Sequence, residues 1–104
     1  MTGGKSFNKS FLEDCRSEEA FWINYGRTVR NLNDLINAIK NMKPETFRYH
    51  VNEDNNKNDF ADWIRSILDN EELAIELEGI VDQEEYIDIL CKKELELIKI
   101  KNSQ

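Results

Sequence analysis

One signal recurs along this chain: a short polar side chain stands directly before an amphipathic stretch of sequence. Asn31, Asn58, Asp69 and Asp82 hold these positions. Asn and Asp side chains accept a hydrogen bond from the unpaired N–H groups of a first helical turn, so each position predicts a helix start. Pro44 predicts a further start, because a first turn does not need the N–H that proline lacks. The sequence therefore predicts a mainly α fold, a compact bundle of about five or six short helices joined by tight corners.

The apolar residues that follow these positions recur with a helical period. After Asn58 they follow the i, i+3, i+4, i+7, i+8 pattern of a helix with one buried face. This set is Phe60, Trp63, Ile64, Ile67 and Leu68. Similar stripes predict helices over residues 31–42, 44–51, 69–79 and 82–98.

Two features complicate the last of these helices. Glu94 falls on its apolar face, so we expect either that the helix has left the core by this residue or that Glu94 pairs with a cation. The alternation of apolar and charged residues over 94–101 leaves a terminal strand as an alternative.

The N-terminal third is less regular. We expect residues 1–6 to be a flexible tail and residues 7–104 to form a single helical domain, in which residues 7–17 form a short helix. Apolar and polar residues alternate from Phe21, which predicts a small β-hairpin near residues 21–30 that turns at Tyr25 and Gly26. The alternative is a helix that runs from Ser17 through residue 23 and stops at Gly26.

Charge is distributed unevenly along the chain. Residues 1–50 carry a net charge of +2 and residues 51–104 carry −9, within a total of −7. An acidic half repels phosphate groups, so we expect the protein to bind neither nucleic acid nor anionic membranes. We see no apolar stretch of the roughly 18 to 20 residues that a membrane helix needs, and no secretory signal, so we expect a cytoplasmic protein. Cys15 and Cys91 lie far apart without CxxC spacing, which favours reduced, partly buried thiols.

Residues 52–58, NEDNNKN, form a predicted polar loop that resembles a calcium-binding loop only in part. Asp54, Asn56 and Asn58 stand at alternate positions, as in an EF-hand. However, Asp59 stands where that loop needs glycine, and Arg65 stands where it needs glutamate. A solvated turn is therefore expected, and the sequence contains no other metal or cofactor motif.

The candidate site centres on residues 48–50, because they combine the only histidine of the chain with an arginine and a tyrosine. Arg48, Tyr49 and His50 precede the polar loop, and Asp59 follows it. Trp22 and Tyr25 fall outside the apolar stripes, so we expect exposed aromatic side chains of the kind that anchor interfaces.

Two functional interpretations follow. The first is a noncatalytic binding or regulatory module that presents this site to a protein or a small molecule. The second is an enzyme or accessory subunit that uses His50 with Asp59 or Asp62 as an acid/base pair. We favour the first, because a lone histidine without a nucleophile or further ligands rarely forms a catalytic site. Homo-oligomerisation through the C-terminal helix is a further expectation, since Leu97 and Ile98 have no obvious partner within the chain.

The residues of the central stretch also carry a resemblance to a known family. The pattern spans residues 21–78, and its parts are Gly26, Asn31-Leu32, Leu35, Phe47-x-Tyr49-His50-Val51, Asn58-Asp59-Phe60-Ala61-x-Trp63-Ile64 and Glu72-Leu73-Ala74. In this order it resembles a family of small archaeal and bacterial domains of unknown function. The resemblance implies a compact, mainly helical domain. It supplies no established activity and no catalytic residues.

Overall fold

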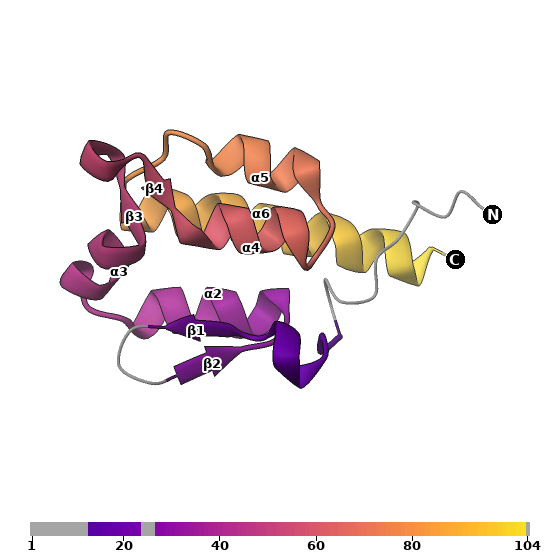
Figure 1. The fold of residues 1–104 in the computed structure, drawn as a ribbon. Coiled ribbons are helices and arrows are strands. Elements are labelled where there is room, and N and C mark those ends of the chain that lie inside the picture. Colours follow the sequence, from indigo (N-terminus) through magenta and orange to yellow (C-terminus); the bar gives the residue numbers. More distant parts are fainter. Residues whose placement is uncertain (1–12, 24–26, 104) are drawn as a thin grey trace.

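The computed structural model describes residues 13–23 and 27–103, and Figure 1 shows how their helices and strands are arranged. In chain order the elements are the 3₁₀ turn η1 (Ser17–Glu19), β1 (Phe21–Ile23), β2 (Arg27–Val29), α2 (Leu32–Asn41), α3 (Pro44–His50), β3 (Val51–Asn52), the 3₁₀ turn η2 (Glu53–Asn55), β4 (Lys57–Asn58), α4 (Asp59–Ser66), α5 (Glu71–Leu77) and α6 (Gln83–Asn102). The predicted mainly α fold is confirmed.

The helices pack around one core. α2 packs against α6, α4 packs against α5, and α5 packs against α6. The two short hairpins lie at the margins of this helical body (Figure 1). The largest side chains that are fully buried are Phe47, Phe60 and Tyr86 together with Leu32, Leu35, Ile39, Ile64, Leu68, Leu73, Leu77 and Leu90.

The predicted hairpin near residues 21–30 is confirmed. β1 and β2 pair antiparallel, with Phe21 opposite Val29 and Ile23 opposite residue 27. The strand alternates as a half-buried strand should, because Ile23 is buried and Trp22 is exposed. The alternative of a helix through residue 23 is wrong, since helical structure there ends with η1. The predicted turn of the hairpin, Tyr25 and Gly26, lies outside the described residues.

The predicted helix over residues 7–17 is wrong where the structure describes it, and residues 7–12 lie outside the described part. Residues 13–16 are not helical. The backbone N–H of Cys15 donates to the carbonyl of Arg30 at 2.8 Å, and the Arg30 guanidinium donates back to the carbonyl of Cys15. These bonds extend the end of the hairpin instead of closing a helical turn. Cys15 is buried, and both Cys15 and Cys91 are free thiols.

The helix starts at Asn31 and Pro44 are confirmed. The Asn31 side chain accepts from the N–H of Asp34 at 2.7 Å, and Pro44 is the first residue of α3. α3 then directs Phe47 and His50, three residues apart, toward the core.

The predicted polar loop over residues 52–58 is instead a second, smaller hairpin. β3 and β4 pair antiparallel, with Val51 opposite Asn58 and Asn52 opposite Lys57. Asn56 closes the turn with a φ of 52°, a left-handed conformation that asparagine tolerates better than most residues. The hairpin therefore brings the end of α3 beside the start of α4.

The predicted cap at Asp69 is wrong by one residue. Asp69 has a φ of 56°, so it reverses the chain after α4 instead of opening the next helix. Asn70 is the cap of α5, and its side chain accepts from the N–H of Leu73 at 2.9 Å. The predicted end near Gly79 agrees with the structure, because α5 stops at Leu77 and Gly79 has a φ of 80°.

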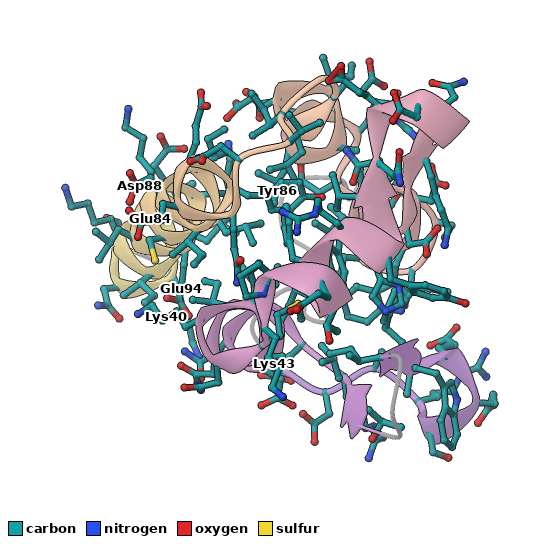
Figure 2. The ribbon with its side chains drawn as sticks, turned by 90° about the vertical axis from the view of Figure 1, so that its left-hand side faces the viewer. Lys40, Lys43, Glu84, Tyr86, Asp88 and Glu94 are labelled. Atoms are coloured by element: carbon teal, nitrogen blue, oxygen red, sulfur yellow. The ribbon has the colours of Figure 1, made fainter. Side chains whose placement is uncertain are left out.

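The last helix is longer than predicted. Asp82 caps α6 by accepting from the N–H of Glu85 at 2.9 Å, and the helix continues for 20 residues, so the terminal-strand alternative is wrong. Figure 2 shows Tyr86 pointing from α6 into the interior, while Asp88 lies on its outer side. In the described part of the chain, no helix is both long and apolar enough to cross a membrane.

The charged residues on the inner side of α6 find partners. Glu94 is partly buried and accepts from the side-chain amide of Asn33 at 2.9 Å. Neither expected alternative holds, because the helix still contacts the core at Leu97 and the partner of Glu94 is a neutral amide instead of a cation. Leu97 packs against the core, whereas Ile98 is exposed.

Lys93 also lies on this side of α6 and is buried, with its ammonium 3.2 Å from Glu96 and 3.3 Å from Glu72. Burial lowers the pKa of Lys93, but the hydrogen bonds to Glu96 and Glu72 outweigh it and leave the pKa above its ordinary value.

Candidate functional site

An open, shallow groove of about 600 Å³ lies where β1, the end of α3, β4 and the first turn of α4 meet. Figure 1 shows β1 and α4 on the same side of the molecule, with α3 and the β3–β4 hairpin at one end. The residues that line it are Phe21, Trp22, Ile23, Tyr49, His50, Lys57, Asp59, Asp62 and Trp63. We call it the aromatic groove, because five of these nine side chains are aromatic or imidazole rings.

His50 forms part of the floor of the aromatic groove. It is the last residue of α3, and only 3% of its surface is exposed. Its ring lies among those of Phe21, Tyr49 and Phe60, with centroid separations of 5.2, 4.9 and 5.1 Å. Its Nδ1 lies 3.0 Å from Oδ2 of Asp59. The ring is almost fully covered, and its carboxylate partner is the first residue of α4.

Asp59 is shared between two basic groups. Oδ2 of Asp59 lies 3.0 Å from Nδ1 of His50 and 3.3 Å from Nζ of Lys57. The same ammonium donates to the backbone carbonyl of Tyr49 at 2.7 Å and lies 4.0 Å from the centroid of the Tyr49 ring. These contacts join the end of α3 to β4 and to the start of α4.

Asn58 holds Asp59 in this position. Its side-chain oxygen caps α4 by accepting from the N–H of Ala61 at 3.2 Å, and it also accepts from the hydroxyl of Tyr86 at 2.6 Å. Its amide nitrogen donates to the carbonyl of Leu77 at 3.0 Å. Burial raises the pKa of the Tyr86 phenol above its ordinary value, so the hydroxyl remains a donor over the whole neutral range. One side chain therefore ties α4, the end of α5 and α6 together directly behind the groove.

Two aromatic side chains project from the margins of the aromatic groove. Trp22 of β1 is 69% exposed and Tyr49 of α3 is 54% exposed. By contrast, Trp63 is 7% exposed and is fixed by its indole N–H, which donates to the carbonyl of Glu19 at 2.8 Å. The side chain of the same residue is also engaged: a hydrogen bond from Arg16 holds the pKa of the Glu19 carboxyl below its usual value.

Asp62 adds a second carboxylate to the aromatic groove. Its side chain is 73% exposed, and its Oδ1 lies 3.5 Å from a guanidinium nitrogen of Arg65, one helical turn later. That guanidinium has a closer partner in Glu78 at 2.7 Å and another in Glu71 at 3.3 Å. Asp62 is therefore only weakly held.

The structure brings four of the predicted site residues together and separates or leaves out the others. Trp22, Tyr49, His50 and Asp59 all line the aromatic groove. Arg48 is exposed but lines a different, smaller hollow beside the β3–β4 hairpin. Tyr25 lies outside the described residues.

Lys57 and Phe21 are groove residues that the sequence did not indicate. Lys57 is the single cation of the NEDNNKN stretch, but this alone does not indicate a site residue. It lies beside Tyr49 only because the β3–β4 hairpin reverses the chain. Phe21 was assigned only to a strand, and nothing in the sequence places it against a ring 29 positions away.

The aromatic groove combines ring faces with charged side chains. The His50–Asp59 contact has the geometry of an oriented imidazole, but the covered ring lacks open access to a substrate. Across residues 13–23 and 27–103, no three His, Cys, Asp or Glu side chains converge to hold a metal ion. Two exposed rings beside two carboxylates and one ammonium can bind a flat or cationic group by contact and charge.

Comparison with known proteins gives one match. The model of a family of unknown function, DUF5752, matches residues 14–102. Neither the curated proteins nor the solved structures gave a match to this chain. Because the family model covers almost the whole chain, the protein belongs to this family of unknown function.

Proposed function

We propose that this domain is a noncatalytic binding module that receives a protein partner in the aromatic groove. The observation that carries the proposal is the exposure of Trp22 and Tyr49, whose rings stand at the margins of one groove although most other large apolar side chains in the described residues are buried. Exposed aromatic rings beside a concave surface are typical of the anchors of protein interfaces.

The rigidity of the groove floor supports the same proposal. His50, Asp59 and Lys57 are tied to one another and to Tyr49, so the floor is organised before any ligand arrives. A preorganised surface loses little conformational entropy on binding.

The proposal can be tested by comparing an exposed position in the aromatic groove with an exposed position outside it. In one variant Trp22 is replaced by benzoylphenylalanine, a photo-crosslinking amino acid that keeps an aromatic ring at this position, and in the other the same amino acid replaces Leu95, which is 60% exposed on α6. In extracts of the source organism, we expect the residue-22 variant to form a discrete adduct that a Tyr49→Ser substitution removes and that the residue-95 variant does not form. Identical adduct patterns at both positions, or a residue-22 adduct indifferent to Tyr49→Ser, would contradict the proposal.

A second candidate function rests on the 3.0 Å contact between His50 and Asp59. A carboxylate that orients an imidazole is the arrangement of an acid/base pair, and Asp62 lines the same groove. This candidate predicts that the protein consumes a component of a metabolite extract, measured by mass spectrometry, and that an Asp59→Asn variant does not. The same variant should still form the crosslinked adduct at residue 22. The binding module predicts that no component is consumed by either protein.

A further inference from the structure

We infer that the aromatic groove takes a basic protein segment, with the guanidinium of an arginine side chain held between the indole of Trp22 and the carboxylate of Asp62. This inference rests on the proposed binding function and names the chemistry of its ligand. It is argued from the charge of the groove, from an internal cation that already occupies part of it, and from the two groups that remain available.

The charge of the aromatic groove favours a cation. Asp59 and Asp62 supply two carboxylates, and Lys57 is the single cationic side chain among the lining residues. The half of the chain that supplies Lys57, Asp59 and Asp62, residues 51–104, carries a net charge of −9 and the whole chain carries −7, so long-range attraction favours basic segments over acidic ones.

Lys57 shows what kind of group this surface holds. Its ammonium lies 4.0 Å from the centroid of the Tyr49 ring and 3.3 Å from Oδ2 of Asp59. An aromatic face combined with a carboxylate is the pairing that recognises lysine and arginine side chains. One such cation site in the groove is therefore filled by the protein itself.

Trp22 and Asp62 offer the same two chemical groups, and the cation nearest to Asp62, the Arg65 guanidinium at 3.5 Å, lies closer to Glu78. The Trp22 side chain is the most exposed aromatic group of the described residues, and Asp62 is only weakly paired with Arg65, which is engaged more closely by Glu78. Both line the aromatic groove. An entering cation can contact the indole and the carboxylate without displacing Lys57.

Arginine fits this pair better than lysine. A guanidinium is planar, so it stacks on an indole while its N–H groups donate to a carboxylate, and it loses less hydration than an ammonium does. A segment with arginine therefore binds more tightly than the same segment with lysine.

The two indole N–H groups of the protein provide the assay. In ¹⁵N-labelled wild-type protein, the Trp22 indole reports on the groove, and the Trp63 indole, which is bonded to the carbonyl of Glu19, is an internal reference. The probes are three Gly/Ser peptides of equal length that carry spaced arginine, lysine or glutamate residues. We expect the arginine peptide to shift the Trp22 signal, the lysine peptide to bind more weakly, and the glutamate peptide to produce no shift.

Matched variants separate a site from general charge attraction. Asp62→Asn removes one negative charge inside the aromatic groove, and Asp88→Asn removes one on the outer side of α6, at the opposite side of Figure 2 from the β1–β2 hairpin. We expect Asp62→Asn to weaken binding of the arginine peptide, followed by the Trp22 signal, by about three- to fivefold, the effect of losing one exposed cation contact. Asp88→Asn should change affinity by less than about twofold, as expected for a screened surface charge.

Three results would overturn the inference. Equal weakening by Asp62→Asn and Asp88→Asn would mean that basic peptides are attracted only by net charge. A larger Trp22 shift with the glutamate peptide would assign the groove to an acidic ligand. If no peptide shifted Trp22 at millimolar concentration, the groove would not recognise basic segments. A discrete crosslinked partner at residue 22 in any of these cases would leave the binding function standing and remove only the ligand class.

Discussion

The contact between Asn58 and Tyr86 can be tested by a double-mutant cycle, because one oxygen atom serves both a helix cap and a buried hydroxyl. Tyr86→Phe removes the hydroxyl that donates to Asn58 at 2.6 Å and leaves the ring in place. The Asn58 oxygen keeps its second donor, the N–H of Ala61, so it is not orphaned. We expect a loss of about 1 kcal/mol, the net value of one hydrogen bond.

Asn58→Ala should be more damaging. It removes the cap of α4, worth about 1 kcal/mol, and it leaves the fully buried hydroxyl of Tyr86 without its acceptor, which costs about 1–3 kcal/mol. The carbonyl of Leu77 also loses its donor from the Asn58 amide. The expected total is about 2–5 kcal/mol, a large part of the stability of a domain of this size.

The double variant decides whether the two residues act as a unit. In the Asn58→Ala background, Tyr86→Phe removes the orphaned hydroxyl, so it should cost nothing or restore stability. Chemical denaturation of the four proteins, followed by circular dichroism, gives the coupling energy, expected to be about 1–2 kcal/mol. If the two losses instead added to within about 0.5 kcal/mol, the hydroxyl would not depend on Asn58 and the reasoning would be refuted.

Three further predictions concern groups near the groove and on α6. Because burial raises the pKa of Tyr86 above its ordinary 10.0, the unfolded chain releases this proton before the folded protein does. Stability should therefore fall as pH rises above about 10, by up to roughly 1.4 kcal/mol per pH unit from this group, and Tyr86→Phe should remove that part of the slope in denaturation curves at pH 9–11. Asp59→Ala should destabilise the fold by about 1–3 kcal/mol, and Asp59→Asn by less, because an amide oxygen can still accept from His50; equal thermal shifts would contradict this hydrogen bond. Lys93→Met should change the unfolding free energy by less than about 1 kcal/mol, because the carboxylates that pair with the Lys93 ammonium are exposed and contribute little. Lys93→Ala should cost more, because the buried methylene groups of Lys93 contribute packing that alanine lacks. A larger loss for Lys93→Met than for Lys93→Ala would indicate that the ion pairs dominate.

The helices could be predicted because their signals are local. Asn31, Asn58 and Asp82 cap helices as predicted, since a cap acts on N–H groups two or three residues away. Asp69 misled the prediction because its neighbour Asn70 is an equally good cap. The choice between them depends on the backbone conformation of Asp69, whose φ of 56° places it in the turn between α4 and α5, and residue type alone does not indicate that conformation.

The second hairpin could not be predicted, because its strands are too short to have a period. Two residues in each strand show no alternation, and the composition of NEDNNKN is that of any solvated turn. The hairpin forms because Val51 is buried on one side and Asn58 is fixed by three hydrogen bonds on the other. The burial of Val51 and two of these three hydrogen bonds, to Leu77 and Tyr86, involve residues far away in the sequence.

The candidate site could be predicted only in part, because some of its residues are brought together by contacts between distant parts of the sequence. Tyr49, His50 and Asp59 drew attention by residue type, and they lie together. Arg48 was included with them only as a sequence neighbour, and on a helix the adjacent residue points about 100° away. It faces another hollow, whereas Lys57, which no local pattern marked, completes the cluster.

The two carboxylates of the aromatic groove have different parts in the fold, and this difference supports the proposed cation site at Asp62. Asp59 holds His50 and Lys57, so a ligand that competed for it would also loosen the end of α3 from the start of α4. Asp62 lies one helical turn after Asp59 and is more exposed to solvent. Its partner, Arg65, lies closer to Glu78 than to Asp62. A cation that binds Asp62 therefore gains a charge contact and competes only with the long 3.5 Å contact to Arg65. Asp59 therefore fixes the groove, and the more exposed Asp62 is the carboxylate at which we propose that the partner binds.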